Sequence, residues 1–133
     1  MGYRSEVAIG IRLNNSKVNW ETFVTECKAR HPLAFNNEDL CFDIFNERKI
    51  MAFTQYGLKW YPDSKDVQAF MGVINVAKEY NDQHELDVFD IAYVRVGEEP
   101  DDVEVDYTGN GYEMFEPYTN IGGDLYDELY GGK

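Results

Sequence analysis

The period of the hydrophobic pattern changes along the chain, and this alternation restricts the possible folds more than any other feature of the sequence. Residues 6–13 alternate between apolar side chains and small or charged ones, a period of two that is typical of a β-strand with one apolar face. Residues 17–30 place apolar side chains at helical spacing, which predicts an amphipathic helix capped by Ser16 or Asn19. Its apolar stripe consists of Trp20, Phe23, Val24 and Cys27.

The same two periods return further along the chain. Residues 41–45 and 50–56 are strand-like runs joined by a short polar connector, which predicts a hairpin, and Gly57 extends the second run as a bulge or bend. A second helix starts at residues 62–64, with Asp63 or Ser64 as its cap, and ends near residues 81–82. Residues 86–96 form a strand with apolar residues on both faces, which indicates a central place in the sheet. The stripe of the second helix is Val67, Phe70, Met71, Ile74 and Ala77.

The order strand, helix, strand, strand, helix, strand predicts an α+β domain with a ferredoxin-like βαββαβ core. In that arrangement two helices cover one face of an antiparallel sheet. We expect residues 1–97 to form this core, residues 98–121 an acidic hairpin extension outside it, and residues 122–133 a glycine-flanked tail, all in a single domain. Within the extension, residues 103–107 alternate like a strand, and residues 112–115 are expected to pair back onto it.

Negative charge is concentrated toward the C-terminal end of the chain. The net charge is −13, yet residues 1–80 contain ten acidic and ten basic residues, whereas residues 81–133 contain fifteen acidic residues against Arg95 and Lys133. Such a field repels nucleic-acid phosphates and anionic lipid and attracts basic surfaces. We therefore expect no direct contact with nucleic acid or a membrane. No segment reads as a secretion signal or a membrane span, so a cytoplasmic protein is expected.

The residues that usually carry catalysis are few and isolated. His31 and His84 lie at a helix end and in a polar loop, Cys27 lies on an apolar stripe, and no serine lies in a nucleophile motif. The sequence also lacks a phosphate-binding glycine loop. We therefore predict a protein that is not an enzyme and uses no cofactor. The alternative is an enzyme whose carboxylates converge only in the fold.

One acidic segment partly matches a calcium-binding loop. Asp102, Glu104, Asp106 and Glu113 occupy positions one, three, five and twelve of an EF-hand loop, where calcium ligands are required. The glycine required at position six is Tyr107, and the flanking residues read as strands rather than helices. A solvated acidic hairpin explains the segment better, and we predict no metal site.

The segment after residue 97 interleaves carboxylates with aromatic rings. Carboxylates along a folded hairpin can form charge-assisted bonds with arginine or lysine, and rings contribute buried contact area. We therefore predict that this segment binds a protein with a basic surface, such as a groove evolved for nucleic acid. The predicted contact residues are Glu98, Glu99, Asp101, Asp102, Glu104, Asp106, Tyr107, Tyr112, Glu113 and Phe115.

Three short segments carry a resemblance to known proteins. They are residues 2–8 (GYRSEVA), 58–62 (LKWYP) and 94–98 (VRVGE), the last followed by Asp101 and Asp102. Over residues 2–107 the chain resembles a group of small acidic proteins encoded by tailed bacteriophages. The resemblance implies expression in the cytoplasm of a bacterial host. For proteins of this class it also implies inhibition of host enzymes or immune systems, CRISPR effectors included. No catalytic residues are established for the group, so none is carried over.

These observations lead to two hypotheses. The first is a phage-encoded inhibitor, an anti-CRISPR or similar antidefence factor, that binds a host defence or nucleic-acid-processing protein. It would present its acidic, tyrosine-rich surface to a basic groove as a DNA mimic does. The second is a structural or regulatory phage protein without inhibitory activity, which self-associates through a sheet edge and whose acidity serves only solubility. The sequence leaves the partner's identity and the oligomeric state open.

Overall fold

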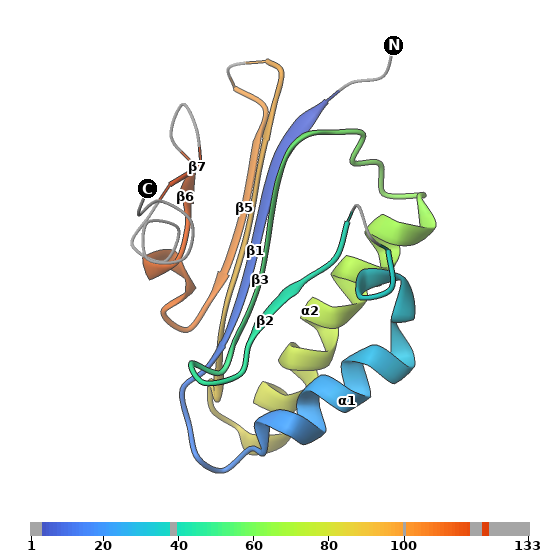
Figure 1. The fold of residues 1–133 in the computed structure, drawn as a ribbon. Helices are drawn as coiled ribbons and strands as arrows, with labels where there is room; N and C mark the ends of the chain where they lie inside the picture. The colour runs from blue at the N-terminus through green and yellow to red at the C-terminus, as the bar shows by residue number, and fades with distance from the viewer. Residues whose placement is uncertain (1–3, 38–39, 100, 118–120, 123–133) are drawn as a thin grey trace.

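The computed structural model describes residues 4–37, 40–99, 101–117 and 121–122. Its helices and strands are shown in Figure 1. The main elements are β1 (Ser5–Leu13), α1 (Trp20–Arg30), β2 (Asp43–Phe45), β3 (Ile50–Leu58), α2 (Lys65–His84), β4 (Phe89–Gly97) and β5 (Val103–Thr108). The shorter ones are the 3₁₀ turns η1 (Pro32–Ala34) and η2 (Gly111–Glu113) and the paired segments β6 (Glu116–Pro117) and β7 (Ile121–Gly122).

Strands β1 to β5 form one antiparallel sheet in the order β2-β3-β1-β4-β5. Helices α1 and α2 lie on one face of this sheet (Figure 1), so the predicted α+β class is confirmed. The four-stranded ferredoxin-like core is not confirmed, because the sheet has five strands. The additional strand, β5, comes from the segment predicted to lie outside the core. It pairs with β4, which gives β4 a neighbour on both sides and confirms its central position.

The predicted signals at the start of α1 and at Gly57 are both confirmed. The side chain of Asn19 accepts a hydrogen bond from the backbone N–H of Thr22 at 2.9 Å, which makes it the N-cap of α1. Gly57 has a φ of 70° and lies where β3 carries one more residue than β1 between paired positions. This is a bulge, and glycine adopts the positive φ without a steric penalty.

Helix α2 runs further than the sequence pattern predicts. It reaches His84 and stops at Glu85, whose left-handed backbone closes the last turn. The helix continues past Asn81 because this polar residue is buried and hydrogen-bonded. Its amide accepts a hydrogen bond from the Phe89 N–H at 2.9 Å and donates to the Phe89 carbonyl at 3.2 Å. The last turn of α2 is therefore fastened to the start of β4.

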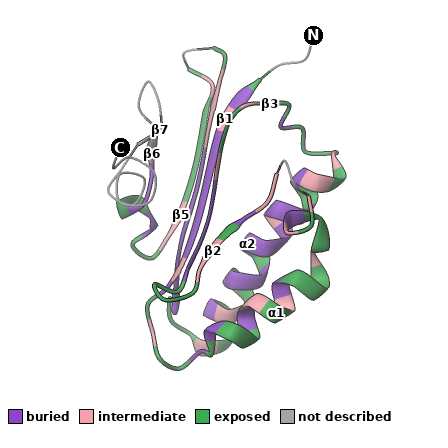
Figure 2. Cartoon of the chain, viewed as in Figure 1, coloured by how far each residue is buried: buried purple, intermediate pink, exposed green. Residues whose placement is uncertain are grey.

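The main core lies between the helices and the sheet. Figure 2 shows buried residues on the sides of α1 and α2 that face the strands. Phe23 of α1 stacks near Phe89 of β4 at a ring separation of 4.3 Å, and Phe70 of α2 near Phe53 of β3 at 4.4 Å. Burying each such ring stabilises the fold by about 1.5–3 kcal/mol. The apolar stripes predicted for both helices therefore form this core.

A second core covers the opposite face of the sheet. We call it the far-face core; its buried members are Ala8, Ile50, Ala52, Ala92, Val94, Met114 and Phe115. Small residues on β1, β3 and β4 leave a trough that Met114 and Phe115 fill. A Cβ atom on Gly10 would lie 2.9 Å from Cε2 of Phe115, so this position needs glycine to let the ring approach the strand.

The far-face core corrects the prediction for residues 112–115. Instead of pairing back onto residues 103–107, the chain forms the turn η2 and then places Met114 and Phe115 against the sheet. The physical reason is that a sheet with helices on one side still has an apolar second face to bury. The predicted tail, residues 122–133, lies outside the described residues except for residue 122.

A buried carboxylate fixes the turn that leads into the far-face core. Asp90 accepts hydrogen bonds from Arg12 at 2.8 Å, from the Asn14 amide at 2.7 Å and from the Asn110 N–H at 3.0 Å. Arg12 also binds Glu113 at 3.0 Å. A buried charge is tolerated when it is paired and hydrogen-bonded in this way. The contacts join β1, β4 and the start of η2, and so position the segment that fills the trough.

Candidate functional site

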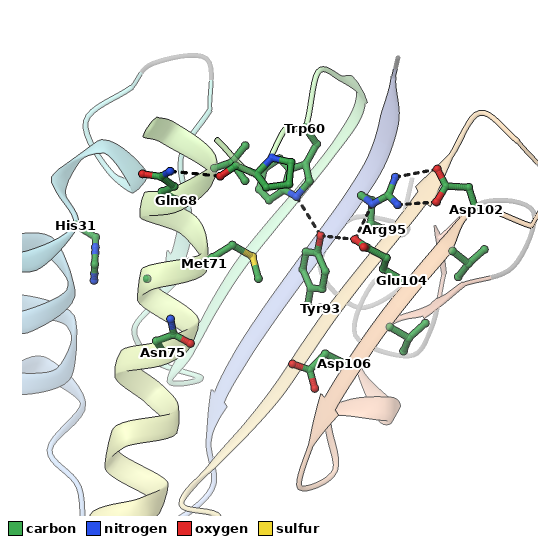
Figure 3. Close-up of a pocket in the computed structure, with 15 residues that line it drawn as sticks. His31, Trp60, Gln68, Met71, Asn75, Tyr93, Arg95, Asp102, Glu104 and Asp106 are labelled. Atoms are coloured by element: carbon green, nitrogen blue, oxygen red, sulfur yellow. Dashed lines mark hydrogen bonds and ion pairs between the residues drawn. The ribbon is translucent and has the colours of Figure 1, made fainter. Parts of the chain in front are cut away.

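A groove lies on the helix side of the sheet, between α2 and the strands β4 and β5 (Figure 3). Its volume is about 1180 Å³. Helix α2 contributes Gln68, Met71 and Asn75, and the strands contribute Tyr93 and Glu104. The groove exists because α2 packs against β4, while β5 widens the sheet beyond that strand.

A chain of hydrogen bonds runs along the strand side of the groove. Trp60 donates from Nε1 to the Tyr93 hydroxyl at 3.0 Å, and this hydroxyl donates to Oε1 of Glu104 at 3.2 Å. Arg95 donates from Nε to the same Glu104 oxygen at 2.8 Å. Its two terminal nitrogens bind Asp102 at 2.6 and 3.2 Å. Figure 3 shows these side chains directed toward one another from three parts of the chain.

This network holds its protons firmly. Burial, followed by the charge of Glu104, raises the pKa of Tyr93 to about 12. The hydrogen bond to Asp102 raises the pKa of Arg95, against the opposing effect of burial. Both groups therefore stay protonated at neutral pH. The network is an arrangement of charges and dipoles joined by hydrogen bonds.

The two outward carboxylates of β5 keep about half of their surface open. Glu104 is 56% exposed although it binds Arg95, and Asp106 is 52% exposed although it binds Lys78 of α2 at 2.8 Å. Asp102 is more enclosed, because both its oxygens bind Arg95. A carboxylate has about four lone-pair sites. Glu104 and Asp106 therefore retain acceptor capacity toward a second cation.

The turn between β4 and β5 carries three more of the predicted contact residues. Glu98, Glu99 and Asp101 are all exposed. The carboxylate of Glu98 accepts a hydrogen bond from the backbone N–H of Arg4 at 2.7 Å, which ties the turn to the start of β1. With Glu104 and Asp106 they form one continuous acidic hairpin, which we call the β4–β5 hairpin (residues 89–108).

The predicted aromatic contacts are not gathered with these acids. Phe115 is fully buried in the far-face core, so its assignment as a surface contact is wrong. Tyr107 is partly buried, and its hydroxyl donates to the Phe115 carbonyl at 2.8 Å. Tyr112 is 55% exposed but lies with Glu113 in η2, beyond the far end of β5. A six-residue strand spans about 17 Å, so these residues and the acidic turn do not form one compact patch.

Sequence reasoning missed the basic residues that pair with these acids. Arg95 and Glu104 are direct cross-strand partners in the β4–β5 register. A hairpin predicted from the sequence with its turn at residues 97–102 would have placed Arg95 opposite Glu104. The contact between Lys78 and Asp106 has no local signal, because it depends on how α2 lies over the sheet.

The histidine and cysteine considered as catalytic candidates do not join the groove network, although His31 lines the groove. His31 lies across α2 from Tyr93 (Figure 3), and its ring packs against Gly72. Burial and the charge of Arg30 lower its pKa, opposed by Glu79. Burial raises the pKa of Cys27 to about 12, as expected for an inert thiol in the core.

Among residues 4–37, 40–99, 101–117 and 121–122, no group of three or more His, Cys, Asp or Glu residues is placed to hold a metal ion. Three ligands of the hypothetical calcium loop bind guanidinium groups instead: Asp102 and Glu104 bind Arg95, and Glu113 binds Arg12. Among the described helices, none has the length and apolar character needed to cross a membrane.

The chain matches no protein-family model, no curated protein and no solved structure. Function is therefore inferred from the geometry and charge of the described residues.

Proposed function

We propose that this chain is a phage-encoded inhibitor that binds a host defence or nucleic-acid-processing protein by placing its β4–β5 hairpin in a basic groove. The observation that carries the proposal is a set of exposed carboxylates along one hairpin. They extend from the turn onto one side of the edge strand β5 and comprise Glu98, Glu99, Asp101, Glu104 and Asp106.

The hairpin keeps a net negative charge after its internal ion pairs are counted. Residues 98–106 contain six acids, of which Arg95 binds Asp102 and Glu104 and Lys78 binds Asp106; six negative charges against these two positive ones leave −4. The paired acids contribute less than isolated ones would. The three turn acids, Glu98, Glu99 and Asp101, are all exposed and are therefore candidates for contact. The overall charge of −13 would steer the chain toward a basic surface.

Two features of the groove support a role in binding. A nucleophile needs an adjacent base or a lowered pKa, whereas the pKa values of Tyr93 and Arg95 are both raised. In the described part of the chain, every buried side-chain polar atom has a hydrogen-bond partner. The groove network therefore resembles a preformed, satisfied support for the hairpin, which fits a protein that acts by contact.

Two finer points belong to the same proposal. The chain order β1, α1, β2, β3, α2, β4 supports interpreting residues 5–97 as a ferredoxin-like arrangement to which β5 is added. The resemblance to phage proteins supports action in the bacterial cytoplasm.

Affinity capture from a bacterial host lysate tests the proposal. The tagged chain is compared with a hairpin variant in which Glu98, Glu99 and Asp101 are each replaced by lysine. A matched control carries Glu21→Lys, Glu47→Lys and Asp63→Lys, three exposed acids outside the hairpin, so both variants have the same net charge. We expect the hairpin variant alone to lose the captured protein, and the capture by the unmodified chain to weaken with added salt.

Other results would contradict the proposal. Equal loss from both variants would mean that overall charge, not the hairpin, governs capture. Full capture by the hairpin variant would remove the turn acids from the binding surface. A captured protein that keeps its activity when saturated with this chain would exclude inhibition.

A further inference from the structure

The outer edge of β5 is a strand edge without a neighbouring strand among the described residues. The Gly97 N–H binds the Asp102 carbonyl at 2.8 Å, which marks a hydrogen-bonded position of the β4–β5 ladder. Such positions alternate in an antiparallel pair. Glu104 and Asp106 therefore direct their backbone N–H and C=O groups toward β4. Val105 directs its N–H and C=O in the opposite direction, toward the outer edge of the sheet.

The two faces of this edge differ in chemistry. Glu104 and Asp106 lie on the helix side, opposite Arg95 and Tyr93, and keep half of their surface exposed. Val105 and Val103 lie on the far face and are 42% and 39% exposed, which is high for valine in a strand. A strand placed beside β5 would meet carboxylates on one face and apolar side chains on the other.

We propose that β5 binds the partner by strand addition, and that the added segment alternates basic and apolar residues. This inference rests on the proposed function, since it specifies how the acidic hairpin would engage a basic protein. Main-chain bonds to Val105 would supply general affinity, and the alternating side chains would supply selectivity. Opposite charges in directly facing cross-strand positions stabilise such a pairing, as do facing apolar pairs.

The groove provides room for the basic side chains. It has a volume of about 1180 Å³ and lies on the same side of the sheet as Glu104 and Asp106. A lysine or arginine opposite these acids could extend over them, with its apolar stem near Met71 and its charged end near the carboxylates. Asn75 and Gln68 supply further polar groups on the opposite wall.

Charge argues against a second copy of this chain as the occupant. A symmetric antiparallel pair centred on Val105 would place Glu104 of one copy opposite Asp106 of the other, twice. Like charges in directly facing positions destabilise a strand pair. Acidic side chains on an edge strand are a known means of preventing self-pairing. The other edge of the sheet, β2, is only three residues long.

The test uses the full chain and synthetic peptides with capped ends. The first peptide has the sequence TKVKVKVT; a second, TKKKVVVT, has the same composition without alternation. In a strand added to β5, the valines would face Val105 and exchange main-chain bonds with it, while the lysine N–H groups point away. N-methylating the valines should therefore abolish pairing, and N-methylating the lysines should not. Binding is measured by calorimetry, and hydrogen exchange is measured at the Val105 amide.

We expect the alternating peptide to bind at least tenfold more tightly than the other sequence and to slow exchange at Val105 at least tenfold. Valine N-methylation should cost at least tenfold in affinity, and lysine N-methylation less than threefold. Replacing Glu104 with Gln and Asp106 with Asn should weaken binding and reduce its salt dependence.

Two results would overturn strand addition. If the rearranged or valine-methylated peptide binds as well as the first, the surface attracts positive charge without pairing backbones, and the proposed function stands without this inference. If no peptide binds, strand addition is excluded, and the proposed function is still decided separately by the capture experiment with the hairpin variant.

Discussion

Replacing Phe115 with alanine should destabilise the whole domain instead of affecting a binding surface. The side chain is fully buried, and its ring lies against Gly10 and the small residues of the far-face trough. Truncating a buried phenylalanine costs about 3–5 kcal/mol in free energy of unfolding. Because Met114 is flexible and can move into part of the space, we expect the lower end, about 3 kcal/mol.

Urea unfolding followed by tryptophan fluorescence measures this change. Trp20 and Trp60 both belong to the main core, so they report the unfolding of the helix side while the mutation lies on the other side. With a slope of about 1–3 kcal/mol per molar urea, the midpoint should fall by about 1–3 M. Tyr112→Ala is the matched control: its ring is 55% exposed, and we expect a change within about 0.5 kcal/mol.

A double-mutant cycle with Gly10→Val tests the contact itself. Valine at this position would meet the ring of Phe115, so we expect a cost of about 1–3 kcal/mol in the otherwise unmodified chain. In the Phe115→Ala background the valine methyl groups can occupy the vacated space, and the cost should fall by at least about 0.5 kcal/mol. If Phe115→Ala is no more destabilising than Tyr112→Ala, or if the two substitutions are additive, the described packing of the far face is wrong.

Three further predictions concern the groove network, the bulge in β3 and alkaline pH. Arg95→Met should lower the free energy of unfolding by about 1–3 kcal/mol in urea titrations, because Asp102 and Glu104 lose their ion pairs with Arg95; an unchanged midpoint would contradict the network. Gly57→Ala should cost about 1–2 kcal/mol from the positive φ alone, since a Cβ there meets nothing within 4 Å, and Gly57→Asn should cost less. The raised pKa of Tyr93, about 12 against 10 for a free tyrosine, gives stability that is fully present below pH 10 and lost as the pH rises toward 12. Tyr93→Phe should therefore lose less stability than the unmodified chain between pH 9 and 11.5, and superimposable curves would refute the assignment.

The helices and central strands could be predicted from the sequence because their signals are local. The stripe of Trp20, Phe23 and Cys27 becomes the buried side of α1, and Asn19 caps it as the side-chain pattern indicates. The far-face core could not be predicted in the same way. In the sequence, Ala8 and Gly10 indicate a strand face with no large side chains. The residue that packs against this face is Phe115, more than a hundred positions away in the sequence. A run of small residues does not reveal which distant side chain fills it.

The acidic surface was predicted in composition but not in arrangement. The concentration of carboxylates after residue 97 correctly locates the exposed acids of the β4–β5 hairpin. Their ion pairs depend on register and on packing: Arg95 binds Asp102 and Glu104 only because β5 pairs with β4, and Lys78 binds Asp106 only because α2 lies nearby. A count of charges along the chain treats every acid as equivalent, whereas in the fold Arg95 encloses Asp102 more than Glu104, and both Glu104 and Asp106 stay about half exposed.

Met114 and Phe115 cover the second face of the sheet, and this has a consequence during synthesis on the ribosome. Translation delivers all residues of the central strands β1, β3 and β4 before the two side chains that shield their second face. For that interval a nascent chain exposes an apolar surface of alanine and valine, and strand pairing between distant segments is intrinsically slow. Such a growing chain is vulnerable to aggregation. Binding by a chaperone at this stage, and release once residue 115 has left the exit tunnel, would match the order in which the fold becomes complete.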